Sequence, residues 1–373
     1  MIYLDNAATS FPKPKSVIKA VDECLRTYCG NPGRSSHRLS MLSSEEIYRT
    51  RECVADFFGY YSPENVVFTH NATDALNIAI KTTVPKNSHI IISDIEHNAV
   101  IRPIEKLKRE YGIEYSCFNS DSNIEEEILK LARHDTKCIV STLCSNVTGK
   151  RVDLGALSRA SRRLKLPLIV DASQAAGHFK INFEKTPFDI LCAPAHKSLF
   201  GIQGCGFAIF TDGRARESFI EGGSGSESLN PEMPARLPER FEAGTPAVAS
   251  IVSLRYGIEY INALRIEFVS EKLGMLTKEM SARLASIKGV SLLAADEGIV
   301  SFTFGNVPSS KLSCELDKYG ICTRSGLHCA PSAHKKLGTL DIGAVRISFS
   351  CFNSIRDTDA VYKAMKKIEK TGL

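Results

Sequence analysis

Four polar side chains that can do chemistry each follow a short apolar stretch of the sequence. They are His97 after "HIIIS", Asn146 after "KCIVSTL", Asp171 after "LPLIV" and Lys197 after "DILCAPA". The apolar stretches have the length and composition of strands that are buried on both faces. Because ligands of open α/β sheets bind at the carboxyl ends of the strands, we expect these side chains to lie around one site.

Lys197 and Asp171 have the most specific chemistry of the four. Desolvation disfavours the charged form of a buried lysine, which makes the neutral amine available for Schiff-base formation. A carboxylate such as Asp171 at a buried strand end needs a cationic partner or strong hydrogen-bond donors. Each residue also has an ordinary alternative when taken alone: Asp171 as a helix cap, His97 as a structural histidine and Asn146 as a turn residue.

A phosphate site is predicted where Ala72 and Thr73 open a helix directly after the strand "NVVFT". The free N–H groups and the dipole of a helix N-terminus favour an anion, although an ordinary helix cap has the same sequence pattern. With this site, the set comprises a phosphate cradle, a histidine that can stack on a ring, an aspartate for a pyridinium nitrogen and a lysine for an aldehyde. These are the groups that pyridoxal 5′-phosphate requires.

Two further residues point to the substrate. Cys329 lies in "TRSGLHCAPSAHKKLG", with His328 beside it and Arg324 nearby. Neighbouring cationic groups lower the pKa of a thiol, so we predict that Cys329 is a reactive thiolate. Arg346 is a charge inside the apolar strand "AVRISFS". Its guanidinium can bind a substrate carboxylate in two-point fashion, and the alternative is an internal ion pair with Asp or Glu.

The elements that must position these residues indicate an α/β fold with a mainly parallel seven-stranded sheet. The strand "GFAIF" follows "DILCA" too closely for a helical crossover and is expected to run antiparallel. A Gly/Ser/Pro-rich segment, 222–246, is long enough to be functional, and a helix is expected in 250–265. The predicted strands are "NVVFT", "HIIIS", "IEYSCF", "KCIVSTL", "LPLIVDA", "DILCA" and "GFAIF".

A smaller α+β domain is expected in the C-terminal third of the chain. Its predicted strands are "GIVSFTF", "YGICTRS" and "AVRISFS", and its last helix is expected to begin near Ser354, with Asp357 in the first turn. We therefore predict a large domain, 15–260, that binds the cofactor. Residues 1–14 and 261–373 are predicted to form the small domain, which carries the loop with Cys329.

The composition of the 373-residue chain excludes several classes of protein. The net charge is +5 with Lys and Arg scattered, which argues against a nucleic-acid partner. No apolar run reaches the length of a membrane span, and the N-terminus lacks the pattern of a signal peptide. The twelve cysteines form no CxxC pair and no Cys/His zinc pattern. We expect a cytoplasmic protein with reduced thiols and no metal.

With these residues in view, the sequence resembles the class V aminotransferase superfamily of fold-type I PLP enzymes. Within it, the sequence is similar to the group II cysteine desulfurases and selenocysteine lyases. The resemblance extends over essentially the whole chain. It rests on "YLDNAATSFPKP", "GNPGRSSHRLS", "EHNAV", "CSNVTG", "VDASQAAGH", "AHKSLFG", "FEAGTP", "RSGLHCAP" and "VRISFSCFN", in this order.

The resemblance implies a role for each cofactor residue. Lys197 would bind the cofactor aldehyde and later move the substrate α-proton, while His97 would stack on the ring and Asp171 would pair with the ring nitrogen. Thr245 would reach the phosphate held by a partner subunit, which implies a homodimer with shared sites. The cofactor-binding residues implied in this way are Ala72, Thr73, His97, Asn146, Asp171, Gln174, His196, Lys197 and Thr245.

The resemblance also implies the reaction. Arg346, with Arg324 and Asn146 close by, would bind L-cysteine, and Cys329 would accept the sulfur as a persulfide while L-alanine is released. His97 and Lys197 would be the other catalytic residues. A separate sulfur-acceptor protein is expected to approach the short cysteine loop. L-Selenocysteine is an alternative substrate, and another class V aminotransferase or lyase, or a catalytically silent relative, is an alternative identity.

Two positions depart from the family pattern. Pro194 occupies a position where the family often has a serine, two residues before the His–Lys pair. Ala72 lies in "NAT", where the family has a Gly-Thr-Thr type of phosphate loop. Both differences remove a hydroxyl or backbone contact to the phosphate, so the phosphate ligands are the least defined part of the predicted site.

Overall fold

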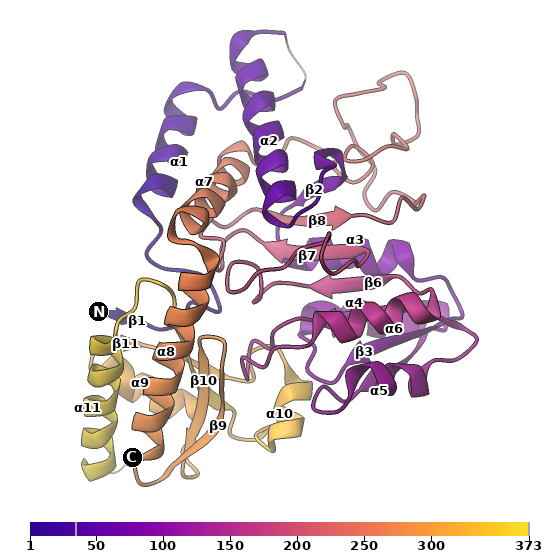
Figure 1. Cartoon of the computed structure of the whole chain (residues 1–373). Helices are drawn as coiled ribbons and strands as arrows, with labels where there is room; N and C mark the ends of the chain where they lie inside the picture. The colour runs from indigo at the N-terminus through magenta and orange to yellow at the C-terminus, as the bar shows by residue number, and fades with distance from the viewer. Residues whose placement is uncertain (34–35, 372–373) are drawn as a thin grey trace.

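The computed structural model describes residues 1–33 and 36–371, and a seven-stranded sheet forms its larger part (Figure 1). The strand order is β2-β8-β7-β6-β5-β3-β4, and β8 runs in the direction opposite to the other six strands of this sheet. All seven predicted strands and the antiparallel direction of "GFAIF" are confirmed. The strands are β2 (Val66–Thr69), β3 (His89–Ser93), β4 (Glu114–Phe118), β5 (Thr136–Thr142), β6 (Leu168–Asp171), β7 (Ile190–Pro194) and β8 (Gly206–Phe210).

Helices cover both faces of this sheet, as continuous apolar strands require. Successive strand residues belong to different hydrophobic clusters: Ile91 packs in one, and Ile90 and Ile92 pack in the other. Helices α3 and α4 lie on the second face, and α2, α5, α6 and α7 lie on the first. The helices are α1 (Lys15–Thr27), α2 (Arg38–Phe57), α3 (Ala72–Thr83), α4 (Asn98–Tyr111), α5 (Ile124–Leu131), α6 (Leu154–Leu164) and α7 (Val248–Leu264), with a 3₁₀ turn η1 (Pro63–Asn65).

The C-terminal part contains an antiparallel sheet of order β12-β13-β10-β9. The predicted strand "YGICTRS" is two strands, since β11 pairs with β1 at the N-terminus whereas β12 pairs with β13. This pairing places the N-terminal strand β1 within the C-terminal part of the fold, and the domain division itself stays a prediction. The elements are β1 (Ile2–Tyr3), α8 (Ile266–Ala285), β9 (Val290–Asp296), β10 (Ile299–Phe304), α9 (Ser309–Asp317), β11 (Ile321–Cys322), β12 (Arg324–Gly326), α10 (Pro331–Leu337), β13 (Ala344–Ser348) and α11 (Ile355–Thr371).

Local signals explain where the last elements begin and end. Helix α11 begins after Ser354, whose N–H donates to Asp357 Oδ2 at 2.9 Å, so the predicted helix start is confirmed. The segment 222–246 contains no helix or strand. None of the helices within residues 1–33 and 36–371 is both long and apolar enough to cross a membrane.

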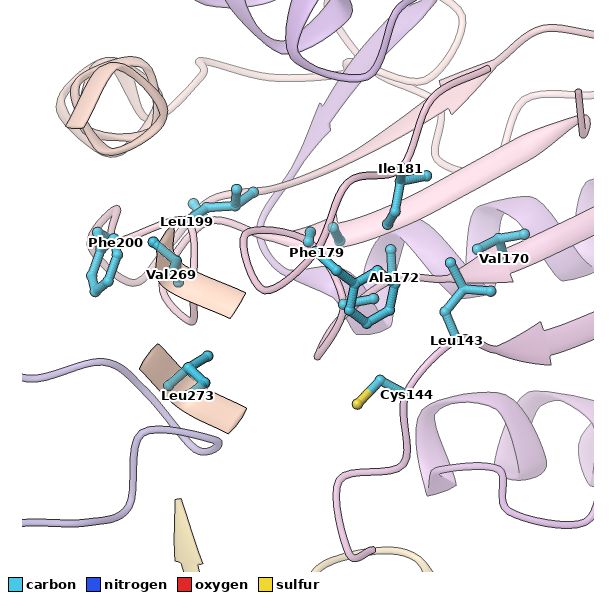
Figure 2. Packing of buried hydrophobic residues seen from close by; sticks show 14 of the residues in the cluster. Leu143, Cys144, Val170, Ala172, Phe179, Ile181, Leu199, Phe200, Val269 and Leu273 are labelled. Carbon is cyan, nitrogen blue, oxygen red and sulfur yellow. The ribbon is translucent and has the colours of Figure 1, made fainter. Parts of the chain in front are cut away.

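The turn that carries Lys197 is fixed by unusually close backbone contacts. A Cβ atom at Gly257 of α7 would lie 1.9 Å from the carbonyl oxygen of Leu199, and one at Gly177 would lie 2.4 Å from that of Ser198. Only glycine permits such an approach, so the turn is wedged between α7 and the Gly177 turn. Leu199 and Phe200 then pack in the hydrophobic cluster that includes Val269 and Leu273 of α8 (Figure 2).

We predict that Gly257→Ala displaces the Lys197 turn, because the added methyl group would overlap the Leu199 carbonyl. The expected loss in free energy of unfolding is about 2 kcal/mol, together with weaker uptake of pyridoxal 5′-phosphate by the apoprotein. Urea unfolding and cofactor titration measure the two effects.

The matched control is Gly274→Ala in helix α8, where a Cβ would meet no atom within 4 Å. This variant gains helix propensity and is expected to be as stable as the wild type or up to about 1 kcal/mol more stable. Equal effects of the two substitutions would contradict the proposal that Gly257 fixes the Lys197 turn through its close approach to the Leu199 carbonyl.

Candidate active site

The side chains at the carboxyl ends of the sheet strands surround one cavity of about 180 Å³. The cavity lies at the carboxyl ends of β2, β3, β5, β6 and β7. It is lined by residues at these strand ends and in the loops that follow them, as expected for an α/β sheet. Every predicted cofactor-binding residue except Thr245 is in its lining. The lining residues are Asn71, Ala72, Thr73, His97, Ala99, Thr142, Cys144, Asn146, Asp171, Ser173, Gln174, Pro194, His196 and Lys197.

Lys197 follows β7 and faces this cavity. Burial lowers the pKa of its amine to about 8, because the surrounding protein solvates the ammonium form poorly. The negative charge of Asp171 opposes the shift, and the positive charges of Arg346 and Arg324 add to it. A lysine with this pKa has an appreciable neutral, nucleophilic fraction near neutral pH.

Asp171 and His97 come from the ends of β6 and β3, the two strands that flank β5. Asp171 ends β6, is almost fully buried, and accepts a hydrogen bond from Ser173 N–H at 2.8 Å through Oδ1. His97 is the N-cap of α4, and its Nδ1 accepts from Ala99 N–H at 3.0 Å. We therefore assign the imidazole proton to Nε2. Burial lowers the pKa of His97, so the ring is neutral at physiological pH.

The start of α3 lines part of the cavity. The Asn71 side chain caps this helix by accepting from Asp74 N–H at 3.0 Å, and it lies directly before the N–H groups of Ala72 and Thr73. These two N–H groups belong to the first turn, where a helix has no internal acceptors. The position is therefore suited to a phosphate despite the alanine at 72 and the proline at 194.

The N-terminal segment is hydrogen-bonded to two residues that line the cavity, His196 and Gln174. The carbonyl of His196 accepts hydrogen bonds from Ser10 N–H at 3.0 Å and from Lys13 Nζ at 2.9 Å. Gln174 Nε2 donates to the Ala7 carbonyl at 3.0 Å. The motif "YLDNAATSFPKP" therefore contributes by fixing the cavity residues, a function that its residue types alone did not reveal.

Arg346 connects the C-terminal sheet to the cavity residues. Its Nη2 donates to Asp5 Oδ1 at 2.8 Å and its Nη1 donates to the carbonyl of Asn146 at 2.9 Å. The alternative predicted for this residue, an internal ion pair, is thus present in the structure. The Nε atom is buried and has no hydrogen-bond partner among the described residues. Binding of a substrate carboxylate by Arg346 stays a prediction.

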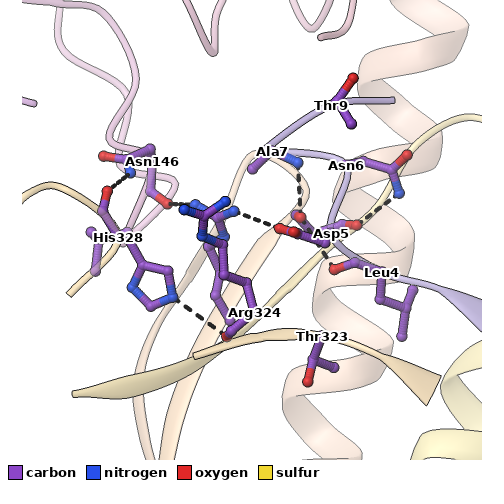
Figure 3. Close-up of polar contacts among 12 residues, drawn as sticks. Leu4, Asp5, Asn6, Ala7, Thr9, Asn146, Thr323, Arg324 and His328 are labelled. Atoms are coloured by element: carbon purple, nitrogen blue, oxygen red, sulfur yellow. Dashed lines mark hydrogen bonds and ion pairs between the residues drawn. The ribbon is translucent and has the colours of Figure 1, made fainter. Parts of the chain in front are cut away.

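Cys329 is exposed and lies beside the cavity rather than in its lining. Its carbonyl accepts from Asn98 N–H at 2.7 Å, and the carbonyl of His328 accepts from Asn146 Nδ2 at 2.7 Å (Figure 3). These bonds tie the cysteine loop to the residue after His97 and to Asn146. Arg324, on β12, is likewise outside the cavity lining. Its positive charge contributes to lowering the pKa of Lys197.

One expectation about Cys329 is wrong. We expected His328 to be a cationic neighbour that lowers the pKa of the thiol. Burial, followed by the nearby charge of Arg346, lowers the pKa of His328 to about 3, so this imidazole is neutral at physiological pH. Exposure of a histidine cannot be read from its type, and the structure places this one inside the protein.

Thr245 is not brought to the cavity. It is exposed and lines a separate pocket of about 770 Å³, which also includes residues of α2 and of the 222–246 segment. This position is compatible with a contact to another molecule, and the predicted role of Thr245 stays a prediction.

Glu96 is a residue of the site that the sequence analysis did not single out. Its carboxyl group is fully buried: Oε1 accepts from Thr142 N–H at 2.8 Å and from Ser93 Oγ, while Oε2 has no partner among the described residues. Burial raises the pKa of Glu96 to about 8, and the negative charge of Asp171 contributes to the increase. The residue is therefore mainly a neutral acid at pH 7.

We predict that Glu96→Gln stabilises the protein increasingly as the pH rises. The Glu96 pKa is higher in the folded than in the unfolded state, so its stabilising contribution is complete below pH 4.5 and is lost as the pH rises toward 8. Glutamine does not ionise. Between pH 5.5 and 8 the difference in free energy of unfolding should grow by about 3 kcal/mol, measured by urea unfolding.

The matched control is Glu23→Gln, which changes an exposed glutamate on α1. It should shift stability by a similar small amount at both pH values. A constant difference between Glu96→Gln and the wild type would show that Glu96 is ionised in the folded protein throughout this range.

Comparison with known proteins agrees with the geometry of the site. The family model "Aminotransferase class-V" matches residues 2–361. A probable cysteine desulfurase of Borreliella burgdorferi is 31% identical over 99% of this chain and 92% of its own length. A probable cysteine desulfurase of Methanothermobacter thermautotrophicus is 29% identical over 100% of this chain and 95% of its own length.

Solved structures show the same fold. The apo structure of a cysteine desulfurase from Thermococcus onnurineus superposes with a TM-score of 0.91 and 28% identity, covering 100% of this chain and 95% of that chain. A cysteine desulfurase from Escherichia coli superposes with a TM-score of 0.90 over 100% of this chain and 95% of that chain, and its 24% identity shows the fold alone. The protein described here therefore belongs to the class V aminotransferase family, and its similar relatives within that family are cysteine desulfurases.

Proposed function

We propose that this protein is a pyridoxal-phosphate-dependent cysteine desulfurase, which converts L-cysteine to L-alanine and transfers the sulfur to Cys329. The observation that carries the proposal is the bond from Asn98 N–H to the Cys329 carbonyl, because it holds an exposed thiol beside the cavity of Lys197. Neither transamination nor a simple lyase reaction requires a thiol at this position.

The cavity residues fit pyridoxal 5′-phosphate. Two buried polar atoms of lining residues, Gln174 Oε1 and His196 Nδ1, have no partner among the described residues, so a polar ligand can satisfy them. Asp171 suits a protonated ring nitrogen, and the start of α3 suits a phosphate. Lys197 offers an amine with a lowered pKa. When bound, the cofactor supplies an electron sink that makes the Cβ–S bond of the substrate cleavable.

The residues of this chain supply binding and proton transfer. Lys197, as a neutral amine, takes the proton from the substrate α-carbon and later returns it. Asp171 would pair with the ring nitrogen of the bound cofactor, and the His97 ring would cover one face of it. Glu96 contributes no second negative charge below its pKa. This leaves Asp171 as the carboxylate that faces the ligand.

Arg346 is suited to hold the substrate carboxylate. Asn146 and Asp5 already fix the orientation of its guanidinium group, and the Nε atom of that group has no partner among the described residues.

In sulfur transfer, the Cys329 thiolate attacks the substrate sulfur. The sulfur–sulfur bond forms while the Cβ–S bond breaks, and the bonding electron pair passes to the substrate carbon. The net change is L-cysteine plus the Cys329 thiol giving L-alanine plus the Cys329 persulfide, with no external oxidant or reductant.

We also propose a homodimer in which Thr245 binds the phosphate of the cofactor that the partner subunit holds. The exposed position of Thr245 in a second, larger pocket supports this, since the residue does not line the cavity of its own chain. A separate acceptor protein would then take the persulfide sulfur from the exposed Cys329.

The cytoplasm is the proposed location. The twelve free cysteines support it, because a reducing compartment keeps thiols unpaired.

We predict that Cys329→Ala lowers alanine formation from L-cysteine by at least about 100-fold, because no thiol remains to accept the sulfur. Cofactor loading, followed by absorbance, should be unchanged. The matched control is Cys314→Ala, which removes an exposed thiol on α9 away from the site and should retain activity. Mass spectrometry of the wild type should find the persulfide on Cys329.

The same assay with L-selenocysteine separates the alternatives. The weaker C–Se bond permits release with less help from Cys329, so Cys329→Ala should keep most of this activity. Full L-cysteine activity in Cys329→Ala would overturn the sulfur-transfer role. Turnover of selenocysteine alone by the wild type would identify a selenocysteine lyase, and formation of a pyridoxamine form with a keto acid would identify an aminotransferase.

We predict that Thr245→Ala weakens pyridoxal 5′-phosphate binding about 10-fold, because a hydrogen bond to the phosphate is lost. Titration of the apoprotein measures the affinity, and sedimentation should show a dimer for both proteins. The control Ser286→Ala removes another exposed hydroxyl and should not change the affinity. A monomeric wild type with unchanged cofactor affinity in Thr245→Ala would contradict the shared site.

A further inference from the structure

A buried hydrogen-bonded chain lies directly behind the cysteine loop. His328 Nδ1 and His334 Nε2 are 3.2 Å apart, and His334 Nδ1 is 2.8 Å from Thr339 Oγ1. At the other end, His328 Nε2 is 3.4 Å from the carbonyl of Arg324. The two imidazoles stack at 5.4 Å with an interplanar angle of 17°. His334 and Thr339 are buried and line no part of the cofactor cavity.

The direction of this chain follows from what each group can donate. The Arg324 carbonyl only accepts, so the proton of His328 is on Nε2 and its Nδ1 accepts from His334 Nε2–H. The Nδ1 of His334 must then accept from the Thr339 hydroxyl. Burial lowers the pKa of both histidines, which agrees with two neutral rings. Thr339, His334 and His328 therefore form a one-way chain that satisfies every ring nitrogen.

The backbone that this chain supports is strained. His328 and Cys329 are consecutive non-glycine residues with φ of 52° and 55°. This left-handed conformation is sterically unfavourable for residues with a Cβ atom and persists only where the surroundings enforce it. On one side, Asn146 and Asn98 hold the two carbonyls of the loop. On the other side, the His328 ring is held by the chain from Thr339.

We propose that His334 and Thr339 are positioning residues that hold Cys329 in its sulfur-accepting conformation by fixing the His328 ring. The inference rests on the proposed role of Cys329, and it assigns a function to the sequence "PSAHKKLGT" that the cofactor and substrate sites do not use. Without the hydrogen bonds from Thr339 through His334 to His328, the loop can relax from its left-handed conformation, and the Cys329 thiol moves away from the substrate sulfur.

The test is Thr339→Val, which removes the first donor with little change in shape, with Thr339→Ser as the conservative control. Thr339→Val should lower kcat for L-cysteine about 10-fold, as expected for one lost buried hydrogen bond, with KM within about 2-fold. Turnover of L-selenocysteine and loading with pyridoxal 5′-phosphate should change little. Thr339→Ser should recover most of the L-cysteine activity.

Two further measurements do not depend on desulfurase activity. The alkylation rate of Cys329 by iodoacetamide, followed by peptide mass spectrometry, should change in Thr339→Val and return toward the wild-type rate in Thr339→Ser. In the ¹⁵N-histidine-labelled wild type, NMR should show His328 and His334 as neutral rings protonated on Nε2, whether or not any variant folds.

Several outcomes would overturn the positioning role. Equal losses of L-cysteine and L-selenocysteine turnover in Thr339→Val would indicate general damage to the site. An unchanged alkylation rate and an unchanged kcat in this variant would show that the hydrogen bonds from Thr339 and His334 do not position Cys329. A different tautomer at either histidine would refute the chain itself. If the wild type forms no Cys329 persulfide, the proposed function fails, whereas the NMR and alkylation results still decide whether the chain orders the loop.

Discussion

The desolvation of Lys197 is the constraint on which the rest of the site depends. An amine with a pKa near 8 requires a turn that excludes water, and that turn exists because Gly257 and Gly177 let the backbone of residues 198–199 approach neighbouring segments closely. The parallel strands then bring Asp171 and His97 to the same edge of the sheet. A displaced turn would leave the other residues in place without a nucleophile.

Neutral groups surround the few charges that the proposed reaction uses. Glu96 is a buried acid with a raised pKa, and His97 and His328 have lowered pKa values. Asp171 is the carboxylate that lines the cavity, and in the proposed reaction the arginines would bind the substrate carboxylate. Burial thus performs two functions, since it activates the lysine and prevents nearby titratable groups from competing with Asp171.

Much of this arrangement could be predicted from the sequence, because strands buried on both faces are continuous apolar runs and ligands lie at their carboxyl ends. The strand β9 was missed because four of its seven residues are exposed and none is buried, so it lacks the long apolar run of a core strand. The pairing of Arg346 with Asp5 joins residues 341 positions apart, which a local pattern does not encode. The neutrality of His328 and Glu96 depends on burial, which only the folded chain determines.

The most direct test of the central claim is to reduce the protein loaded with pyridoxal 5′-phosphate with borohydride and to locate the pyridoxyl group by peptide mass spectrometry. Our account predicts the label on Lys197. Lys13 is the informative alternative, because burial lowers its pKa to about 8 as well, although its Nζ is bound by Ser10 and the His196 carbonyl. A label on Lys13, or no label on Lys197, would contradict the account.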